Sequence, residues 1–194
     1  MKKVNRIALI GVLTAVNVAA RVYLQFLPNV KPVTSIIILC TLAFGLAFGV
    51  ELSVTTVLVS GVLLGLGVFS LFQILAWVLI VVFTFLLDRF LLARVLHSRK
   101  VIFFAVWAFA CGYIYGFFVS LDKLFLSPAL FWAYYLRGLP FDTLHAVGNL
   151  LFYPVCYYAL LPVFSRYAAH SGFTKKSGAV LAPPQGGEEK NDIF

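Results

Sequence analysis

Long, uninterrupted runs of apolar residues restrict what this chain can fold into. Six such runs can be drawn, over residues 7–27, 33–50, 52–68, 72–92, 101–121 and 140–164. Most approach the ~20 residues that a helix needs to cross ~30 Å of hydrocarbon. Backbone groups in lipid must bond internally, and the runs do not alternate in polarity as barrel strands do. The runs therefore predict a helical bundle.

The composition and the ends of the chain refine this prediction. The 194 residues are 62% hydrophobic and 11% charged, whereas a soluble domain is roughly 45–50% apolar and about 25% charged. We expect an all-α integral membrane protein with six transmembrane helices in residues 1–170. The second and third helices are expected to meet near Gly49. Residues 171–194 are polar and cannot bury enough apolar surface to fold, which predicts a disordered cytoplasmic tail.

The placement of basic residues predicts the orientation. Eleven of the 15 Lys and Arg residues lie before the first run, between the fourth and fifth, or after the sixth. With six crossings these places share one side, and the positive-inside rule makes that side, with both termini, cytoplasmic. Charges dispersed at helix ends do not imply a nucleic-acid partner. Four basic residues fall on the other side, where a substrate or an ion pair would explain them: Arg21, Lys31, Lys123 and Arg137.

The stretch YYLRGLPFDTLHAVGN, residues 134–149, crowds polar groups into the start of the sixth run. If Pro140 opens a helix, then Asp142, His145 and Asn149 follow at i, i+3 and i+7 on one face. Such a polar face is costly in contact with lipid, so we expect it to face the interior of the bundle. A hydrogen bond from His145 to Asp142 or Asn149 would satisfy these groups, and metal coordination by the imidazole is the alternative.

Other polar and aromatic groups gather on the same predicted side. Pro28 and Pro32 bracket a stiff loop that holds Lys31. Gln73 and Trp77 share a helical face, either as the lining of a pocket or, for the indole, as an interfacial anchor.

Charged residues near this side have two interpretations. Arg137 pairs with Asp142 or with an anionic ligand, whereas the neighbours Asp122 and Lys123 point differently on a helix and need not pair. An apolar, aromatic pocket with a few polar groups is typical of a small-molecule site. The predicted site comprises Asn29, Lys31, Gln73, Trp77, Tyr113, Tyr135, Arg137, Asp142, His145 and Asn149.

Motifs of nucleotide hydrolysis and metal chemistry do not occur in the sequence. There is no G-x-x-x-x-G-K-[ST], H-E-x-x-H or G-x-S-x-G string. Cys40, Cys111 and Cys156 are interpreted as small buried hydrophobes. We expect no catalytic residue, metal or cofactor of the chain's own, although Asp142 and His145 could serve an intramembrane enzyme as an acid/base pair. A scaffold whose polar groups only pair with one another is a third class.

Small residues recur at four-residue spacing, which lets helices approach closely in lipid. Gly11, Ala15 and Ala19 form a flat stripe in the first run that suits another protein. The other small-residue pairs are interpreted as packing contacts within the bundle: Gly45 and Gly49, Gly61 and Gly65, Gly112 and Gly116.

With these motifs, residues 5–168 resemble the substrate-binding S components of energy-coupling factor (ECF) vitamin transporters. The resemblance rests on the first-run stripe, PNVKPVTSIII, LFQILAW, GYIYG and LPFDTLHAVGN. It implies a six-helix subunit of a bacterial plasma membrane that binds a vitamin from outside and topples to release it inwards. A transmembrane coupling (T) subunit and two cytoplasmic ATPase subunits, which use ATP, supply the energy. The family's A-x-x-x-A docking motif falls on Ala15 and Ala19.

The resemblance is closest to the cobalamin-type branch, which implies a corrinoid ligand. Relatives with the same NVKP loop carry a Gly-Pro-Trp-Thr-Pro-like turn before the fourth helix, whereas this chain reads Gly-Val-Phe-Ser-Leu at residues 67–71. A different vitamin or precursor, such as pantothenate, folate or a queuosine precursor, is the alternative ligand.

Overall fold

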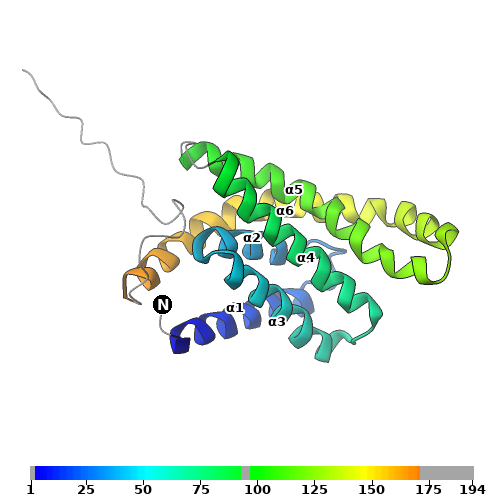
Figure 1. Cartoon of the computed structure of the whole chain (residues 1–194), viewed down its shortest axis with the longest axis horizontal. Helices are drawn as coiled ribbons and strands as arrows, with labels where there is room; N and C mark the ends of the chain where they lie inside the picture. Colours follow the sequence, from blue (N-terminus) through cyan, green and yellow to red (C-terminus); the bar gives the residue numbers. More distant parts are fainter. Residues whose placement is uncertain (1–2, 93–96, 171–194) are drawn as a thin grey trace, which may run out of the picture.

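The computed structural model describes residues 3–92 and 97–170, and these residues contain helices and no strand. The predicted tail, residues 171–194, lies outside the described residues. Figure 1 shows the arrangement of the elements. Their bounds are α1 Lys3–Tyr23, α2 Val33–Phe44, α3 Leu46–Leu64, α4 Val68–Leu86, the π-helical η1 Leu87–Leu91, α5 His97–Ser120, the 3₁₀-helical η2 Leu121–Phe125 and α6 Pro128–His170.

Five helical segments are long and apolar enough to cross a membrane, which indicates a multi-pass membrane protein. They are Lys3–Tyr23, Leu46–Leu64, Val68–Leu91, Arg99–Phe125 and Pro128–Tyr167. Successive helices reverse direction, so that the start of α1 and the end of α6 lie at the same end of the bundle (Figure 1). We call this the terminal end and the opposite end, where α1 leads into α2 and α5 into α6, the loop end.

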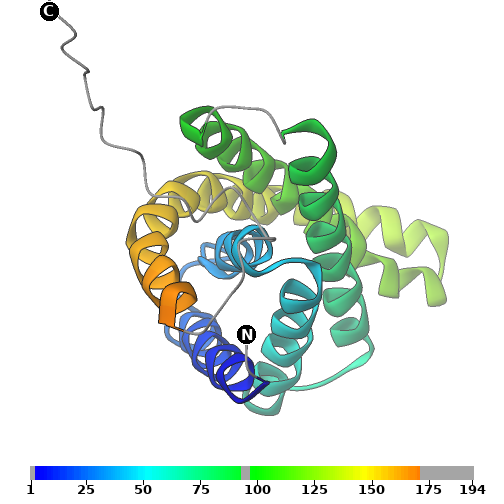
Figure 2. The ribbon, with the colours of Figure 1, turned by 60° about the vertical axis from the view of Figure 1, so that its left-hand side comes forward.

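Helix α2 differs from the predicted second span. It has 12 residues, all buried, and at 1.5 Å per residue it measures only about 18 Å. Figure 2 shows α2 in the middle of the bundle, with the other helices around it. A helix that is apolar all round belongs inside a protein, which explains why this run contains no polar face.

The predicted boundary near Gly49 is wrong, because α2 ends at Phe44 and α3 begins at Leu46. Gly45 between them has φ 90°, a left-handed conformation that costs a side-chain-bearing residue about 1–2 kcal/mol. Gly45 therefore breaks the helix, whereas Gly49 packs closely against Thr41 and Val81, as expected of a packing contact within the bundle. Gly65, at φ 97°, likewise adopts a left-handed conformation directly after the last residue of α3.

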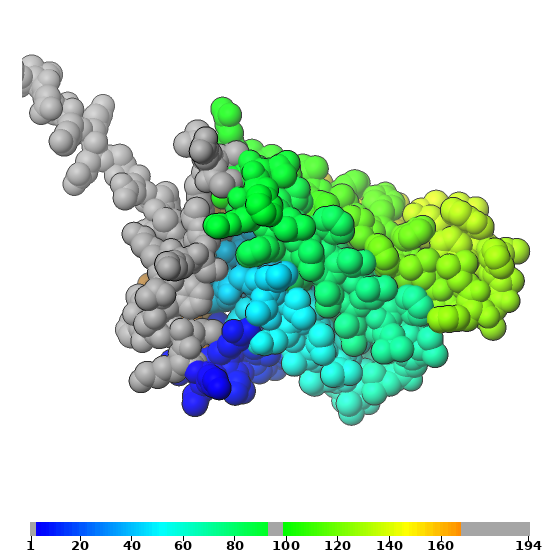
Figure 3. Space-filling model, viewed as in Figure 1, coloured from blue at the N-terminus to red at the C-terminus, as the bar shows by residue number. Residues whose placement is uncertain are grey.

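Helix α6 begins at Pro128, so the prediction that Pro140 opens this helix is wrong. Ser127 Oγ accepts a hydrogen bond from the Leu130 backbone N–H at 3.1 Å and so caps the helix. Pro128 suits the first turn, because a backbone N–H at this position would have no partner within the helix. Pro140 lies inside the helix. Residues 128–139, which precede the sixth predicted run, are thus helical, and the hairpin of α5 and α6 projects beyond the other helices at the loop end (Figures 1 and 3).

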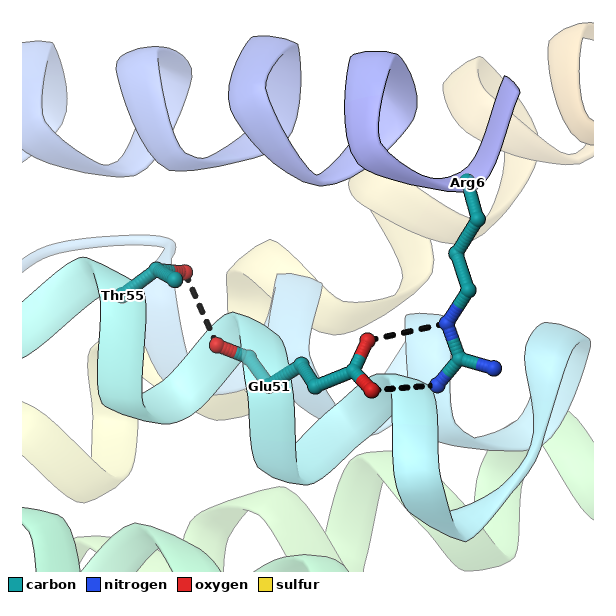
Figure 4. A network of polar contacts seen from close by, with 3 residues as sticks. All are labelled: Arg6, Glu51 and Thr55. Atoms are coloured by element: carbon teal, nitrogen blue, oxygen red, sulfur yellow. Dashed lines mark hydrogen bonds and ion pairs between the residues drawn. The ribbon is translucent and has the colours of Figure 1, made fainter. Parts of the chain in front are cut away.

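Polar contacts join α1 to α3 along the bundle. Arg6 donates two hydrogen bonds to the Glu51 carboxylate, at 2.9 and 2.8 Å; Figure 4 shows this pair beside the bond from the Thr55 hydroxyl to the Glu51 carbonyl. Further along, Asn17 Nδ2 donates to Thr56 Oγ1 at 3.1 Å. In a largely apolar protein such paired groups fix which faces of two helices meet.

Candidate functional site

A cavity of about 100 Å³ lies at the loop end, where the end of α1, the α1–α2 loop and the start of α4 meet α5 and α6. We call it the smaller cavity. It is lined by Arg21, Asn29, Lys31, Val33, Gln73, Trp77, Tyr115 and His145.

A second cavity, of about 500 Å³, adjoins the first under the α5–α6 hairpin, and its volume falls within the range of small-molecule sites, about 300–1,000 Å³. Asn29, Gln73 and Tyr115 line both cavities, so the two are neighbours that share part of their walls. We call this second one the larger cavity. Its other lining residues are Gly116, Val119, Ser120, Tyr134, Arg137, Gly138, Phe141 and Asp142.

The α1–α2 loop is anchored against α6. Asn29 adopts φ 57°, a conformation that asparagine tolerates better than most residues. Val30 packs against Gly148, where an added Cβ would lie 3.2 Å from Val30 Cγ1. This anchoring places Lys31 at the smaller cavity, where burial, and then the positive charge of Arg21, lower the pKa of its ammonium group from 10.5.

Arg21, at the end of α1, is fixed by two residues of α4. Its Nη2 donates to Gln73 Oε1 at 3.1 Å, and its guanidinium lies 5.2 Å from the centre of the Trp77 ring, within cation–π range. Its Nη1 is buried and has no hydrogen-bond partner among the described residues. The guanidinium is therefore oriented before any ligand arrives, with one donor unused.

His145 belongs to a network centred on α2. Trp77 Nε1 donates to Thr34 Oγ1 at 3.1 Å, and the same hydroxyl shares a 3.1 Å hydrogen bond with His145 Nε2. The imidazole also meets the Tyr115 ring edge to face at 5.2 Å. In the described structure neither Asp142 nor Asn149 bonds to His145, so the predicted hydrogen bond is wrong, and His145 Nδ1 is buried without a partner.

Asp142 and Arg137 both line the larger cavity, but they do not form the ion pair that was the first alternative at sequence level. No described residue is within ion-pair distance of either charge. The Asp142 side chain packs on Gly116 of α5, where an added Cβ would lie 2.1 Å from the carboxyl. Lack of a side chain at residue 116 makes this approach possible.

Three residues of the predicted site do not line either cavity. The hydroxyl groups of Tyr113 and Thr143 share a hydrogen bond of 3.0 Å. Tyr135 packs among the rings of Phe117 and Phe131. Asn149 is fully buried, and both polar atoms of its side chain lack a described partner.

Asp122 and Lys123, which need not pair on a regular α-helix, do form an ion pair, at 2.6 Å. They lie in the 3₁₀-helical η2 and not in a regular α-helix. Lys123 also lies 4.8 Å from the centre of the Tyr134 ring. Of the four unexpected basic residues, Lys123 alone is explained by an ion pair in the described structure, whereas Arg21, Lys31 and Arg137 line cavities.

Several residues of this region are absent from the predicted site, among them Arg21, Tyr115 and Thr34. Arg21 is one of the four basic residues on the side opposite the predicted cytoplasmic one, Tyr115 lies two residues from the selected Tyr113, and Thr34 follows the Lys31 loop in the KPVT string. Successive residues on a helix differ by about 100°, so Tyr113 and Tyr115 point in nearly opposite directions. The contacts of the facing helix α6 were needed to choose between them.

The small-residue stripe of α1 lies away from the cavities. Gly11, Ala15 and Ala19 are all exposed, and an added Cβ on Gly11 would meet no atom within 4 Å. The described chain therefore does not use this stripe for internal packing.

The described residues show neither a metal-binding cluster nor a disulfide. Within residues 3–92 and 97–170, no cluster of three or more His, Cys, Asp or Glu side chains could hold a metal ion. Cys40 and Cys111 are buried, Cys156 is half-buried, and all three are free thiols.

Comparison with known proteins finds no relative. No protein-family model matches the chain, and no curated protein and no solved structure is similar to it.

Proposed function

We propose that this chain is the substrate-binding S component of an ECF-type vitamin transporter in a bacterial plasma membrane. Both termini lie in the cytoplasm, and the loop end faces outside. The chain binds a vitamin there and delivers it inwards, while a transmembrane coupling subunit and two cytoplasmic ATPase subunits supply the energy from ATP. It is a transport subunit without an ATPase site or a cofactor of its own.

The observation that carries this proposal is the pair of adjoining cavities at the loop end. Seven predicted site residues from three parts of the chain line them: Asn29, Lys31, Gln73, Trp77, Arg137, Asp142 and His145. Charged and polar groups within apolar helices usually mark the path or site of a ligand. The rings of Trp77, Tyr115, Tyr134 and Phe141 stand among polar and charged groups in these walls, a combination that also fits a small flat or ring-containing molecule.

The exposed stripe of α1 supports the partner half of the proposal. Small residues without internal neighbours leave a flat surface, on which a helix of the coupling subunit can pack closely. In this interpretation Gly11, Ala15 and Ala19 contact the coupling subunit.

A corrinoid of the cobalamin type is the ligand that the sequence resemblance favours. The two neighbouring cavities, which share Asn29, Gln73 and Tyr115, together extend beyond a single small pocket, which suits a large ligand. Pantothenate, folate and a queuosine precursor are the alternatives, because the turn at residues 67–71 differs from that of cobalamin-type relatives.

The enzyme alternative receives little support from the geometry. His145 lines the smaller cavity and Asp142 the larger one. An acid/base pair must reach the same reacting group within hydrogen-bond distance. Thr34, rather than Asp142, orients the imidazole through Nε2.

Two measurements test the proposal. The purified full-length chain in detergent is screened by thermal shift against cobalamin, pantothenate, folate and queuosine precursors; we expect one class to raise the unfolding midpoint without nucleotide, since ligand binding stabilises the native state. Uptake of that compound is then measured in cells with and without the coupling and ATPase subunits. Undiminished uptake without those subunits would reject the proposal.

A further inference from the structure

The positive charges at the smaller cavity have no counterion in the described structure. Residues 3–92 and 97–170 contain four carboxylate side chains. Three form ion pairs elsewhere: Glu51 with Arg6, Asp88 with Lys100 and Asp122 with Lys123. The fourth, Asp142, lines the larger cavity only. Arg21 and Lys31 thus face the smaller cavity together without an acidic partner.

The two cations are held in place although they repel each other. Gln73 and Trp77 fix the guanidinium of Arg21, and the packing of Val30 on Gly148 holds the loop that carries Lys31. Bringing two like charges to one partly buried site costs free energy that these contacts must offset. An arrangement of this kind is favourable once an anion binds, because the anion neutralises both charges.

Two residues that line the smaller cavity carry unused hydrogen-bond donors. Arg21 Nη1 is buried and unpartnered, and such a donor costs stability until an acceptor reaches it. Gln73 accepts from Arg21 through Oε1, which leaves its side-chain NH₂ free to donate. A carboxylate or phosphate offers acceptor oxygens to guanidinium, ammonium and amide groups at once.

We propose that the smaller cavity is an anion site in which Arg21 and Lys31 bind a carboxylate or phosphate group of the transported ligand. That the bound anion is part of a transported ligand rests on the proposed function. The ligand class is then a vitamin or precursor that is an acid or a phosphate ester. The remainder of the ligand extends into the larger cavity, past Asn29, Gln73 and Tyr115, which the two cavities share.

The first test uses inorganic phosphate, so that it does not depend on knowing the ligand. Unfolding midpoints of the full-length chain in detergent are measured in phosphate and in chloride at equal ionic strength. Wild type and the control Arg89→Gln, whose side chain is exposed in η1, should gain stability in phosphate. Arg21→Gln and Lys31→Gln should each lose that gain. Equal gains in all four proteins, or none in wild type, would overturn the anion site.

The second test compares matched ligands and separates carboxylate from phosphate. Pantothenate and its neutral alcohol panthenol differ in a carboxylate, and cobalamin and cobinamide differ in a nucleotide loop with a phosphodiester. We expect the acidic member of one pair to bind at least about tenfold more tightly, as a lost charge-assisted bond implies, and expect Lys31→Gln to abolish that preference. Equal affinities within both pairs would overturn the inference.

The two proposals fail in distinguishable ways. Vitamin binding without preference for the acid contradicts the anion site and leaves the transport function standing. Phosphate stabilisation that depends on Arg21 and Lys31, together with uptake that needs no ATPase subunit, contradicts the transport function and leaves the anion site standing.

Discussion

The indole Nε1–H of Trp77 donates a hydrogen bond to the hydroxyl of Thr34, 3.1 Å away, deep in the bundle. This bond ties α4 to the buried helix α2. Because the same hydroxyl also bonds to His145 Nε2, one small side chain orients two residues that line the smaller cavity. The most buried helix of the protein therefore sets the geometry of its candidate site.

Replacing Thr34 by valine keeps the shape of the side chain but removes both hydrogen bonds. The indole and the imidazole are then left buried without this partner, and we expect the free energy of unfolding to fall by about 1–3 kcal/mol. The measurement is thermal or denaturant unfolding in detergent. Thr143→Val, at an exposed residue of α6, is the control, and an equal effect of the two substitutions would contradict the role of Thr34.

The two ion pairs at the terminal end should differ in strength. Arg6 and Glu51 have side chains 34% and 47% exposed, whereas those of Lys100 and Asp88 are 5% and 18% exposed. An exposed pair contributes only about 0.2–1 kcal/mol, but removing one partner of a buried pair costs about 3–5 kcal/mol. We expect Asp88→Asn to destabilise the protein more than Glu51→Gln in denaturant unfolding. The reverse order would show that these exposures do not govern the two pairs.

Gly112 should tolerate no side chain, because it touches the α6 backbone. An added Cβ would lie 2.5 Å from the Ala146 backbone nitrogen, so Gly112→Ala must push α5 and α6 apart, at a cost of about 1–3 kcal/mol. Gly11→Ala is the matched control, since its Cβ meets no atom within 4 Å. Unfolding midpoints of the two variants compare them. Similar midpoints would contradict the close contact between α5 and α6.

Enlarging the α1 stripe should separate ligand binding from transport. Ala15→Leu and Ala19→Leu place bulk on an exposed surface away from both cavities. If this surface contacts the coupling subunit, vitamin affinity of the isolated chain stays unchanged, whereas co-purification with the coupling subunit and uptake fall. Val12→Leu, also exposed on α1, is the control. Normal assembly of the stripe variants would place the partner elsewhere.

Lys31 should give the stability of the unliganded protein a dependence on pH. Burial and Arg21 lower the pKa of Lys31 below 10.5 in the folded state, so that between the two pKa values the unfolded state binds more protons. Stability then rises with pH across this window. The difference in unfolding midpoint between wild type and Lys31→Gln should increase as the pH rises towards 10.5. A constant difference would contradict the shift.

Anion affinity should change in the opposite direction with pH. Above the lowered pKa, Lys31 loses the charge that attracts the ligand, so phosphate stabilises wild type less as the pH rises towards 10.5. Repeating the measurement with sulfate, whose charge does not change over this pH range, separates this loss from changes in the charge of phosphate itself. A phosphate effect that grows with pH would contradict a role for the Lys31 ammonium group.

Much of the fold follows from local pattern. The long apolar runs predicted the helices that can cross a membrane, and the i, i+3, i+7 spacing placed Asp142, His145 and Asn149 on one inward face, where all three are buried. The shared face of Gln73 and Trp77 also lines one cavity. Periodicity determines which residues of one helix point the same way.

Only the tertiary structure decided where those faces lead. An apolar run has the same appearance whether lipid or protein surrounds it, so hydropathy could not tell that α2 is a short buried helix. Local sequence could not locate the start of α6, because Pro128 and Pro140 are both suited to the first turn of a helix. In the structure the helix begins at Pro128, where Ser127 caps it. The joining of Arg21 and Lys31 at one cavity depends on contacts between segments far apart in the chain, which sequence spacing does not encode.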